Sequence, residues 1–368
     1  MDGSKEEKGM RQKTKRFLMI IAGVWLLLLI MCSFVIYLFF PDLLHPETQE
    51  TSEATTELFA MDTYITMTAY GPDAVIALTK ATDKLTELEQ LWSVTDVNSD
   101  IYAVNHSGGQ AVSVSDETVD LLSFALQMAK DTDGALEPTI YPVLTAWGFT
   151  TGENRIPSDT EITALLKNVG YERVGLEGSN VQLEGGIMLD LGAVGKGYSG
   201  DLVAQVLRDN GITSALLDIG GNIQAVGTKP DGSPWRLGLR DPFSGGTLGV
   251  LEISNMAVVT SGNYERYFIG EDGKQYGHII DPATGHPAEN GLASVTVIAE
   301  KGRLCDALST SLFVMEPDRA VEYWRQHQNF DMILITEDGK IYLTDGIAEV
   351  FTLDSYHSNM KVNVIKHE

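Results

Sequence analysis

Ile187-Met-Leu-Asp-Leu191, followed directly by Gly192-Ala-Val-Gly-Lys-Gly-Tyr198, is the stretch that decides the fold class. Its first part is a short apolar run, which predicts a buried strand. Its glycine-rich part predicts a turn into a helix that ends near Asn210-Gly211, since glycine commonly closes a helix. The next run, Ala215-Leu-Leu-Asp-Ile-Gly-Gly-Asn222, predicts another strand that breaks at its double glycine.

Helical and strand patterns continue on both sides of this stretch. Residues 61–70 alternate as in a half-buried strand, and apolar residues from Leu78 to Trp92 recur every three or four positions as in an amphipathic helix. Ser115 is a typical N-cap for a helix that runs to Lys130. Because strands and helices interleave without a strict βαβ repeat, we expect an α+β domain and not a doubly wound parallel sheet. Further elements are predicted at 248–260 (strand), 293–299 (strand), 305–327 (helix) and 331–344 (hairpin).

The charge of the chain excludes one class of partner. Acidic residues outnumber basic ones 51 to 26 over the 368 residues. Six of the basic residues lie within the first forty positions, so the rest of the chain is more acidic still. Such a surface repels phosphate backbones, and we expect no nucleic-acid partner. An anionic ligand needs a local cation or metal ion.

Residues 17–40 form an uncharged run long enough to cross a bilayer. Lys13, Lys15 and Arg16 precede it, so the positive-inside rule places residues 1–16 in the cytoplasm and the rest outside. A cleaved signal peptide or a lipidated Cys32 are alternatives. We favour a retained single-pass anchor because the run is long and Met31 stands where a lipidation site needs a small residue. Residues 41–58 are predicted as a polar linker and 59–368 as the folded domain.

His278 lies in Tyr276-Gly-His-Ile-Ile-Asp-Pro-Ala-Thr-Gly285, at the end of a strand-like run. A histidine in this position suits a general base, but an ordinary hydrogen-bonded hairpin histidine fits the same pattern. The segment Gly192–Gly197 could cradle a phosphate or simply turn the chain. It is no Walker A loop, because its glycine spacing is too short and glycine follows Lys196.

Cys305-Asp-Ala-Leu-Ser-Thr-Ser-Leu-Phe313 predicts a helix that carries a possible metal site. Asp306 and Thr310 are four residues apart and share one helix face. A carboxylate and a hydroxyl, joined by a backbone carbonyl, suit Mg²⁺ better than zinc. Helix capping by Asp306, with Thr310 bonded back to the backbone, explains the same residues.

The order of these motifs along the chain resembles the ApbE family of exported FAD:protein FMN transferases. The resemblance spans about residues 59–350. It rests on these segments: Met61-Asp-Thr63, Gly134-Ala-Leu-Glu-Pro-Thr139, Trp147-Gly-Phe149, Leu189-Asp-Leu-Gly-Ala-Val-Gly-Lys-Gly-Tyr198, Asp218-Ile-Gly-Gly221, Thr260-Ser-Gly-Asn263, His278–Gly285 and Asp306–Thr310.

The resemblance implies a single mixed α/β flavin-transferase domain that binds FAD and Mg²⁺. The base would be His278. The FAD site would be formed by Met61, Ala135, Leu136, Glu137, Asp190, Lys196 and Ile279. The metal site would be formed by Ala193 (through its carbonyl), Asp306 and Thr310, with Ser309 close by. This chain departs from the family pattern in Asp62, which stands where glycine is usual, in Leu136-Glu137 for Phe-Asp, and in Thr95 for a tyrosine.

The expected reaction is Mg²⁺-dependent transfer of the FMN half of FAD to a Thr or Ser hydroxyl of an acceptor protein, with release of AMP. Two alternatives remain open: hydrolysis of FAD to FMN and AMP, and a non-catalytic FAD-binding surface protein. By resemblance, the acceptors would be membrane redox subunits or an exported flavin-carrying domain.

Overall fold

The computed structural model describes residues 52–367 and five earlier residues, Met19, Gly23, Trp25, Leu27 and Met31. The chain divides into two units, Met1–Ser52 and Glu53–Glu368. The predicted cytoplasmic segment 1–16 lies outside the described residues, as does the predicted span 17–40 apart from those five positions. Among the described residues, no helix has the length and apolar character needed to cross a bilayer.

The second unit opens with a strand where the sequence predicted a linker. β1 (Glu53–Ala60) pairs antiparallel with β2 (Thr63–Tyr70). The predicted linker 41–58 is therefore wrong from residue 53 onward, and the domain starts there instead of at 59. β1 lies at the edge of its sheet and alternates exposed Glu and Thr side chains with half-buried ones. An edge strand of this kind lacks the apolar run by which a central strand is recognised.

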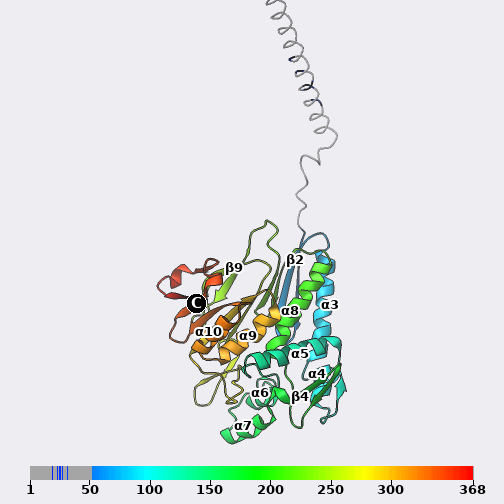
Figure 1. Cartoon of the computed structure of the whole chain (residues 1–368), viewed down its shortest axis with the longest axis vertical. Coiled ribbons are helices and arrows are strands. Elements are labelled where there is room, and N and C mark those ends of the chain that lie inside the picture. The colour runs from blue at the N-terminus through cyan, green and yellow to red at the C-terminus, as the bar shows by residue number, and fades with distance from the viewer. Residues whose placement is uncertain are drawn as a thin grey trace, which may run out of the picture. The chain divides into compact units, whose positions relative to one another are not determined.

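A nine-stranded sheet forms the centre of the domain, in the order β1-β2-β6-β7-β10-β13-β14-β15-β17 (Figure 1). Every neighbouring pair in it is antiparallel except β15 and β17. Three smaller sheets flank it, formed by β16-β9-β8, β3-β5-β4 and β11-β12. The further strands are β3 (Val112–Ser113), β4 (Val174–Glu177), β5 (Asn180–Leu183), β6 (Ser214–Ile219), β7 (Asn222–Val226), β8 (Trp235–Arg240), β9 (Thr247–Ile253), β10 (Ala257–Gly262), β11 (Tyr267–Ile269), β12 (Gln275–Gly277), β13 (Leu292–Ala299), β14 (Asp331–Thr336), β15 (Ile341–Thr344), β16 (Phe351–Leu353) and β17 (Val362–Ile365).

Helices cover one face of the central sheet, as Figure 1 shows for α3, α8, α9 and α10. The helices are α3 (Ala74–Trp92), α4 (Asp100–Asn105), α5 (Asp116–Asp131), α6 (Tyr141–Trp147), α7 (Asp159–Leu165), α8 (Gly192–Asp209), α9 (Gly302–Val314) and α10 (Pro317–Gln326), with short 3₁₀ turns at Leu166–Asn168, Tyr171–Arg173, Asp345–Ile347 and Ser355–His357.

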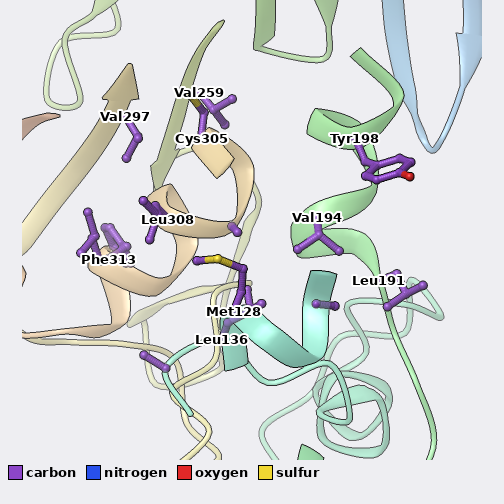
Figure 2. Packing of buried hydrophobic residues seen from close by; sticks show 14 of the residues in the cluster. Met128, Leu136, Leu191, Val194, Tyr198, Val259, Val297, Cys305, Leu308 and Phe313 are labelled. Carbon is purple, nitrogen blue, oxygen red and sulfur yellow. The ribbon is translucent and has the colours of Figure 1, made fainter. Parts of the chain in front are cut away.

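Two hydrophobic cores lie between these helices and the sheet. The larger core joins α5, α8 and α9 to β10, β13 and β14, and Figure 2 shows part of it, including Met128, Val194 and Leu308. The second joins α3 and α8 to β1, β2 and β6. On the other sheet face, the β16-β9-β8 sheet packs through Trp235, Leu251 and Phe351 onto Val258 and Ile333. The domain is thus a mixed α+β fold, as predicted.

Several predicted elements are confirmed. The side chain of Ser115 accepts a hydrogen bond from the Thr118 amide and caps α5. α8 ends at Asp209, next to the predicted Asn210-Gly211 stop. β6 ends before the double glycine, where both Gly220 and Gly221 have positive φ. The hairpin of β14 and β15 turns where it was predicted.

Two predicted elements are each split in the structure. The predicted strand 248–260 is β9 and β10 in different sheets, separated near Asn255, whose φ of 54° lies outside the strand region. The predicted helix 305–327 is α9 followed by α10, because Pro317 lacks the amide proton that a continuous helix needs. Its predecessor Glu316 is accordingly extended, with ψ of 151°.

The stretch around Gly192 also differs from its prediction. Residues 187–191 are not a strand of any sheet and form only an isolated bridge, between Met188 and Ile140. A side chain replaces the neighbouring strand: Asn105 donates to the Leu189 carbonyl (2.9 Å) and accepts from the Leu189 amide (2.6 Å). The predicted glycine loop 192–197 is the beginning of α8 itself. Sequence patterns cannot distinguish a side-chain partner of this kind from a strand ladder.

Candidate active site

α8 and α9 touch at Gly197, and this contact builds the candidate site. A Cβ atom at Gly197 would lie 2.2 Å from the Gly302 carbonyl oxygen and 2.6 Å from the Cβ of Asp306. Only glycine allows the two helices to approach so closely. The Gly197 amide donates a 2.8 Å hydrogen bond to Oδ2 of Asp306. The carboxylate of α9 is thereby held against the first turns of α8.

Oxygen atoms from both helices meet at this contact. In a regular helix the Gly197 amide points to the carbonyl of Ala193, four residues earlier. Regular helix geometry therefore predicts the Ala193 carbonyl close to the amide that binds Asp306. Asp306 is only 3% exposed. The Thr310 hydroxyl has no hydrogen-bond partner within residues 52–367, so it is not bonded back to its own helix. The candidate metal ligands are the Ala193 carbonyl, the Asp306 carboxylate and the Thr310 hydroxyl. All are hard oxygens of the type that Mg²⁺ prefers, so these residues fit a magnesium ion.

Ser309 has a different role from its neighbours. Its buried hydroxyl donates to the Asp306 carbonyl (3.0 Å) and accepts from the Ser261 hydroxyl (2.9 Å). The hydroxyl thus ties α9 to the end of β10, which argues against direct contact with a metal. Asp306 does not cap its helix, because α9 begins at Gly302, whose amide donates to Asp201 on α8 (2.7 Å).

Lys196 supplies the positive charge beside these oxygens. Its ammonium lies 3.9 Å from Oδ1 of Asp306 and 3.4 Å from the Gly192 carbonyl oxygen. Asp190 accepts the Gly192 amide at 2.8 Å and so satisfies one amide at the start of α8. Burial raises the pKa of Asp190, while that hydrogen bond and the charge of Lys196 act in the opposite direction. Both residues lie at the N-terminus of α8: Asp190 precedes the helix and Lys196 is within its first turns, where the sequence predicted a glycine loop.

His278 follows β12 and is held by Arg266. Its Nδ1 lies 3.1 Å from the Arg266 carbonyl oxygen, and its amide donates to the same oxygen at 3.0 Å. Because a carbonyl can only accept, the proton of the neutral imidazole is on Nδ1 and the lone pair is on Nε2. Burial, together with the nearby charges of Arg266 and Lys196, lowers the pKa of His278 to about 4. The imidazole is therefore neutral at physiological pH and able to accept a proton.

The turn that follows His278 is held by hydrogen bonds within itself and to α6. Asp281 accepts from the Ala283 amide (2.9 Å) and from the Thr284 hydroxyl (3.0 Å). The Gly285 carbonyl accepts from the buried indole of Trp147 (2.8 Å), which links the turn to the end of α6. The aromatic ring of Phe149 lies edge-on to the imidazole, 6.4 Å between centroids. Phe149 and Arg266, which both contact His278, also line a pocket together with Gly148, Gly152, Asn154, Glu265 and Tyr267.

The other residues predicted for the FAD site make their main contacts with other residues of this protein. The Glu137 carboxylate accepts from the amide and hydroxyl of Thr139 (2.9 and 2.6 Å) and from the Tyr171 amide (3.1 Å). Burial raises the pKa of Glu137, against the effect of these hydrogen bonds. Leu136 belongs to the larger core, where Figure 2 shows it, as do Ala135 and Ile279.

Met61 stands at the other end of the site, in the β1–β2 turn. Its amide donates to Glu89 (2.7 Å), and its sulfur accepts from Ser199 on α8 (3.4 Å). Met61 is therefore fixed against the same helix that carries Ala193 and Lys196.

One residue of the site was given no function from the sequence. Arg266 holds His278 through its backbone carbonyl, which leaves no local pattern in the sequence. Ser261, which holds Ser309 through its hydroxyl, lies in the Thr260–Asn263 motif, but no individual role was predicted for it.

Comparison with known proteins agrees with this architecture. The sequence model of the ApbE family matches residues 61–334. Curated relatives named FAD:protein FMN transferase include one from Vibrio cholerae, 32% identical over 69% of this chain and 78% of the relative. Another, from Klebsiella pneumoniae, is 32% identical over 77% of this chain and 89% of the relative.

Solved structures give the same result. The ApbE protein of Thermotoga maritima aligns with a TM-score of 0.77 at 31% identity, covering 81% of this chain and 99% of that one. The apo flavinyl transferase ApbE of Pseudomonas stutzeri aligns with a TM-score of 0.74 at 28% identity, covering 83% of this chain and 98% of that one. On the match to the family model and to these relatives, the chain belongs to the ApbE family.

Proposed function

We propose that this protein transfers the FMN half of FAD to a Thr or Ser hydroxyl of an acceptor protein and releases AMP. Its relatives carry the name of this activity. The observation that carries the proposal is the position of Lys196. Its ammonium lies 3.9 Å from the Asp306 carboxylate and close enough to His278 to lower the pKa of the imidazole. One cation thus lies near both an oxygen-rich site and a neutral base.

The protein groups account for the transfer step as follows. Nε2 of His278 takes the proton of the acceptor hydroxyl, and the oxygen attacks the phosphorus of the FMN half. The bond between that phosphorus and the bridging oxygen breaks, AMP leaves, and FMN is held by a phosphoester bond. The ammonium of Lys196 and the positive end of the α8 dipole would stabilise the negative charge of the pyrophosphate. A bound Mg²⁺, held by Asp306, Thr310 and the Ala193 carbonyl, would supply neutralisation of charge on the phosphoryl oxygens.

The pocket beside Phe149 and Arg266 supports a route for the acceptor. Two of its lining residues, Phe149 and Arg266, contact His278, and others belong to the loop that follows α6. We place the incoming acceptor segment there, since its hydroxyl must come within hydrogen-bond reach of Nε2.

The location and the partners are part of the same proposal. The basic residues before position 17 and the uncharged run 17–40 support a single-pass anchor with the domain outside the cytoplasm. Membrane redox subunits or exported flavin-carrying domains would then be the acceptors. Mass spectrometry of membrane proteins that gain FMN only when this chain is expressed identifies them.

The direct test uses the purified domain with FAD and Mg²⁺, with and without an acceptor protein. AMP release together with FMN-modified acceptor supports transfer. AMP and free FMN at the same rate without acceptor indicate a pyrophosphatase instead, and no AMP in either reaction indicates a binding protein.

A further inference from the structure

We infer that the ion pair between Asp62 and Arg266, called the clasp below, positions His278 and fixes its tautomer. The catalytic consequence rests on the proposed function, whereas the structural consequence can be measured without FAD. Both are positioning residues: they act on the base and not on the substrate.

Arg266 is the point where three separate segments meet. Its carbonyl accepts from both the amide and Nδ1 of His278, at 3.0 and 3.1 Å. Its guanidinium donates to the Phe149 carbonyl at 3.1 Å. The same guanidinium lies 3.1 Å from Oδ2 of Asp62. Any movement of the Arg266 backbone therefore moves the acceptor that keeps the proton on Nδ1.

Asp62 lies in a tight turn whose backbone conformation favours glycine over residues with a side chain. Met61 and Asp62 form the two-residue turn between β1 and β2, with φ of 53° and 57°. This left-handed conformation suits glycine and is tolerated by Asp and Asn. Within residues 52–367, Arg266 is the one charged partner of the Asp62 carboxylate. The carboxylate can thus anchor Arg266 from the opposite side of the site.

The turn that carries Asp62 is itself fixed to two helices. The turn is held in place by the 2.7 Å bond from the Met61 amide to Glu89 on α3, and Met61 contacts α8 through Ser199. Asp62 therefore projects from a part of the fold that is fixed to the helix layer. Tyr267, next to Arg266, begins the small β11–β12 sheet, which pairs with no other sheet in the described part of the chain. The clasp joins this small sheet to the fixed turn.

The test combines kinetics with the state of the imidazole. Asp62→Asn keeps a residue that tolerates the turn and removes the charge, and Arg266→Gln removes the other partner. We expect Asp62→Asn to lower kcat for FMN transfer about two- to fivefold, the size of an exposed ion pair, with KM for FAD unchanged. Arg266→Gln should lower it more, because the bond to Phe149 is lost as well. The double variant should be no slower than Arg266→Gln alone, because two partners of one contact do not add.

The spectroscopic measurement needs no substrate. With ¹⁵N-histidine labelling and His278→Gln to assign the signals, wild type should show His278 with the proton on Nδ1. Asp62→Asn should show exchange between the two tautomers. Arg266→Lys keeps the positive charge, so a larger share of its His278 should carry the proton on Nδ1 than in Arg266→Gln. Lys274→Gln is the matched control: it breaks the equally exposed Lys274–Glu289 pair (2.7 Å), which makes no contact with His278.

An unchanged His278 tautomer in both Asp62→Asn and Arg266→Gln would overturn the clasp, as would multiplicative kinetic effects in the double variant. If the proposed function is wrong, the wild-type protein will transfer no FMN. The His278 tautomer can still be measured in the variants and still tests the clasp.

Discussion

The Gly197 amide lies 2.8 Å from Oδ2 of Asp306, and this single hydrogen bond joins the start of α8 to α9. Around it lie the Ala193 carbonyl, Lys196 and Thr310. The site therefore depends on how closely two helices can approach, and Gly197 serves this helix contact and not loop flexibility.

Replacing Gly197 with alanine tests this contact. The new Cβ would overlap the Gly302 carbonyl, so we expect Gly197→Ala to lower the free energy of unfolding by about 1–3 kcal/mol. Gly195→Ala in the same helix is the control. Its Cβ would be 3.9 Å from the nearest atom, on Trp92, and alanine favours helix by up to about 1 kcal/mol. Urea unfolding measures both, and equal stability of the two variants would contradict the close approach.

Asp306→Ala tests the metal site. Because Asp306 would supply the one carboxylate of the predicted ligand set, we expect half-maximal FMN transfer to require at least about tenfold more Mg²⁺. Asp209→Ala, which removes an exposed carboxylate at the other end of α8, should leave the Mg²⁺ titration unchanged. A titration curve for Asp306→Ala that superimposes on wild type would remove Asp306 from the ligand set.

The pH profile tests the base. His278 must be neutral to accept a proton, and its pKa of about 4 means that protonation begins only well below neutral pH. We expect kcat/KM, which reports the free enzyme, to stay level down to about pH 5 and to fall as the pH drops through 4. An ordinary histidine would lose half its activity near pH 6.5. Circular dichroism at each pH separates this loss from unfolding.

His278→Gln should lower the rate about 10²- to 10⁴-fold at pH 7 with FAD binding retained. A variant with a near wild-type rate, or a wild-type midpoint near 6.5, would contradict the assignment of a buried neutral base.

Glu137→Gln distinguishes a ligand from a structural residue. The glutamine amide group would face a backbone amide that now donates to a carboxylate oxygen, so we expect a loss of about 1–3 kcal/mol in stability. KM for FAD should stay within about twofold of wild type, since the carboxylate is already occupied by three protein donors. Glu172→Gln, at an exposed neighbouring position, serves as the control. A large rise in KM without loss of stability would show that Glu137 contacts FAD.

Local patterns were sufficient for elements that carry their own end signals. The Ser115 cap, the stop of α8 and the double glycine after β6 each depend on residues within a few positions. The α+β class follows from the sequence of such elements along the chain.

Patterns failed where a distant partner decides the structure. Residues 187–191 are held by the Asn105 side chain instead of a strand, and the exposed edge strand β1 lacks an apolar signal. Pro317, by contrast, was a local signal, and it ends the helix that was predicted to continue. The site residues were predicted from the order of motifs, while Arg266 was not, because the residues it contacts, His278, Phe149 and Asp62, are distant from it in the sequence.

The most direct measurement of the central claim is intact mass spectrometry of an acceptor protein after incubation with this domain, FAD and Mg²⁺, with AMP quantified in the same sample. The account predicts one FMN phosphoester per acceptor hydroxyl and one AMP per FMN attached, both abolished together in His278→Gln. AMP released without any gain of mass on the acceptor, or equal modification by His278→Gln, would contradict it.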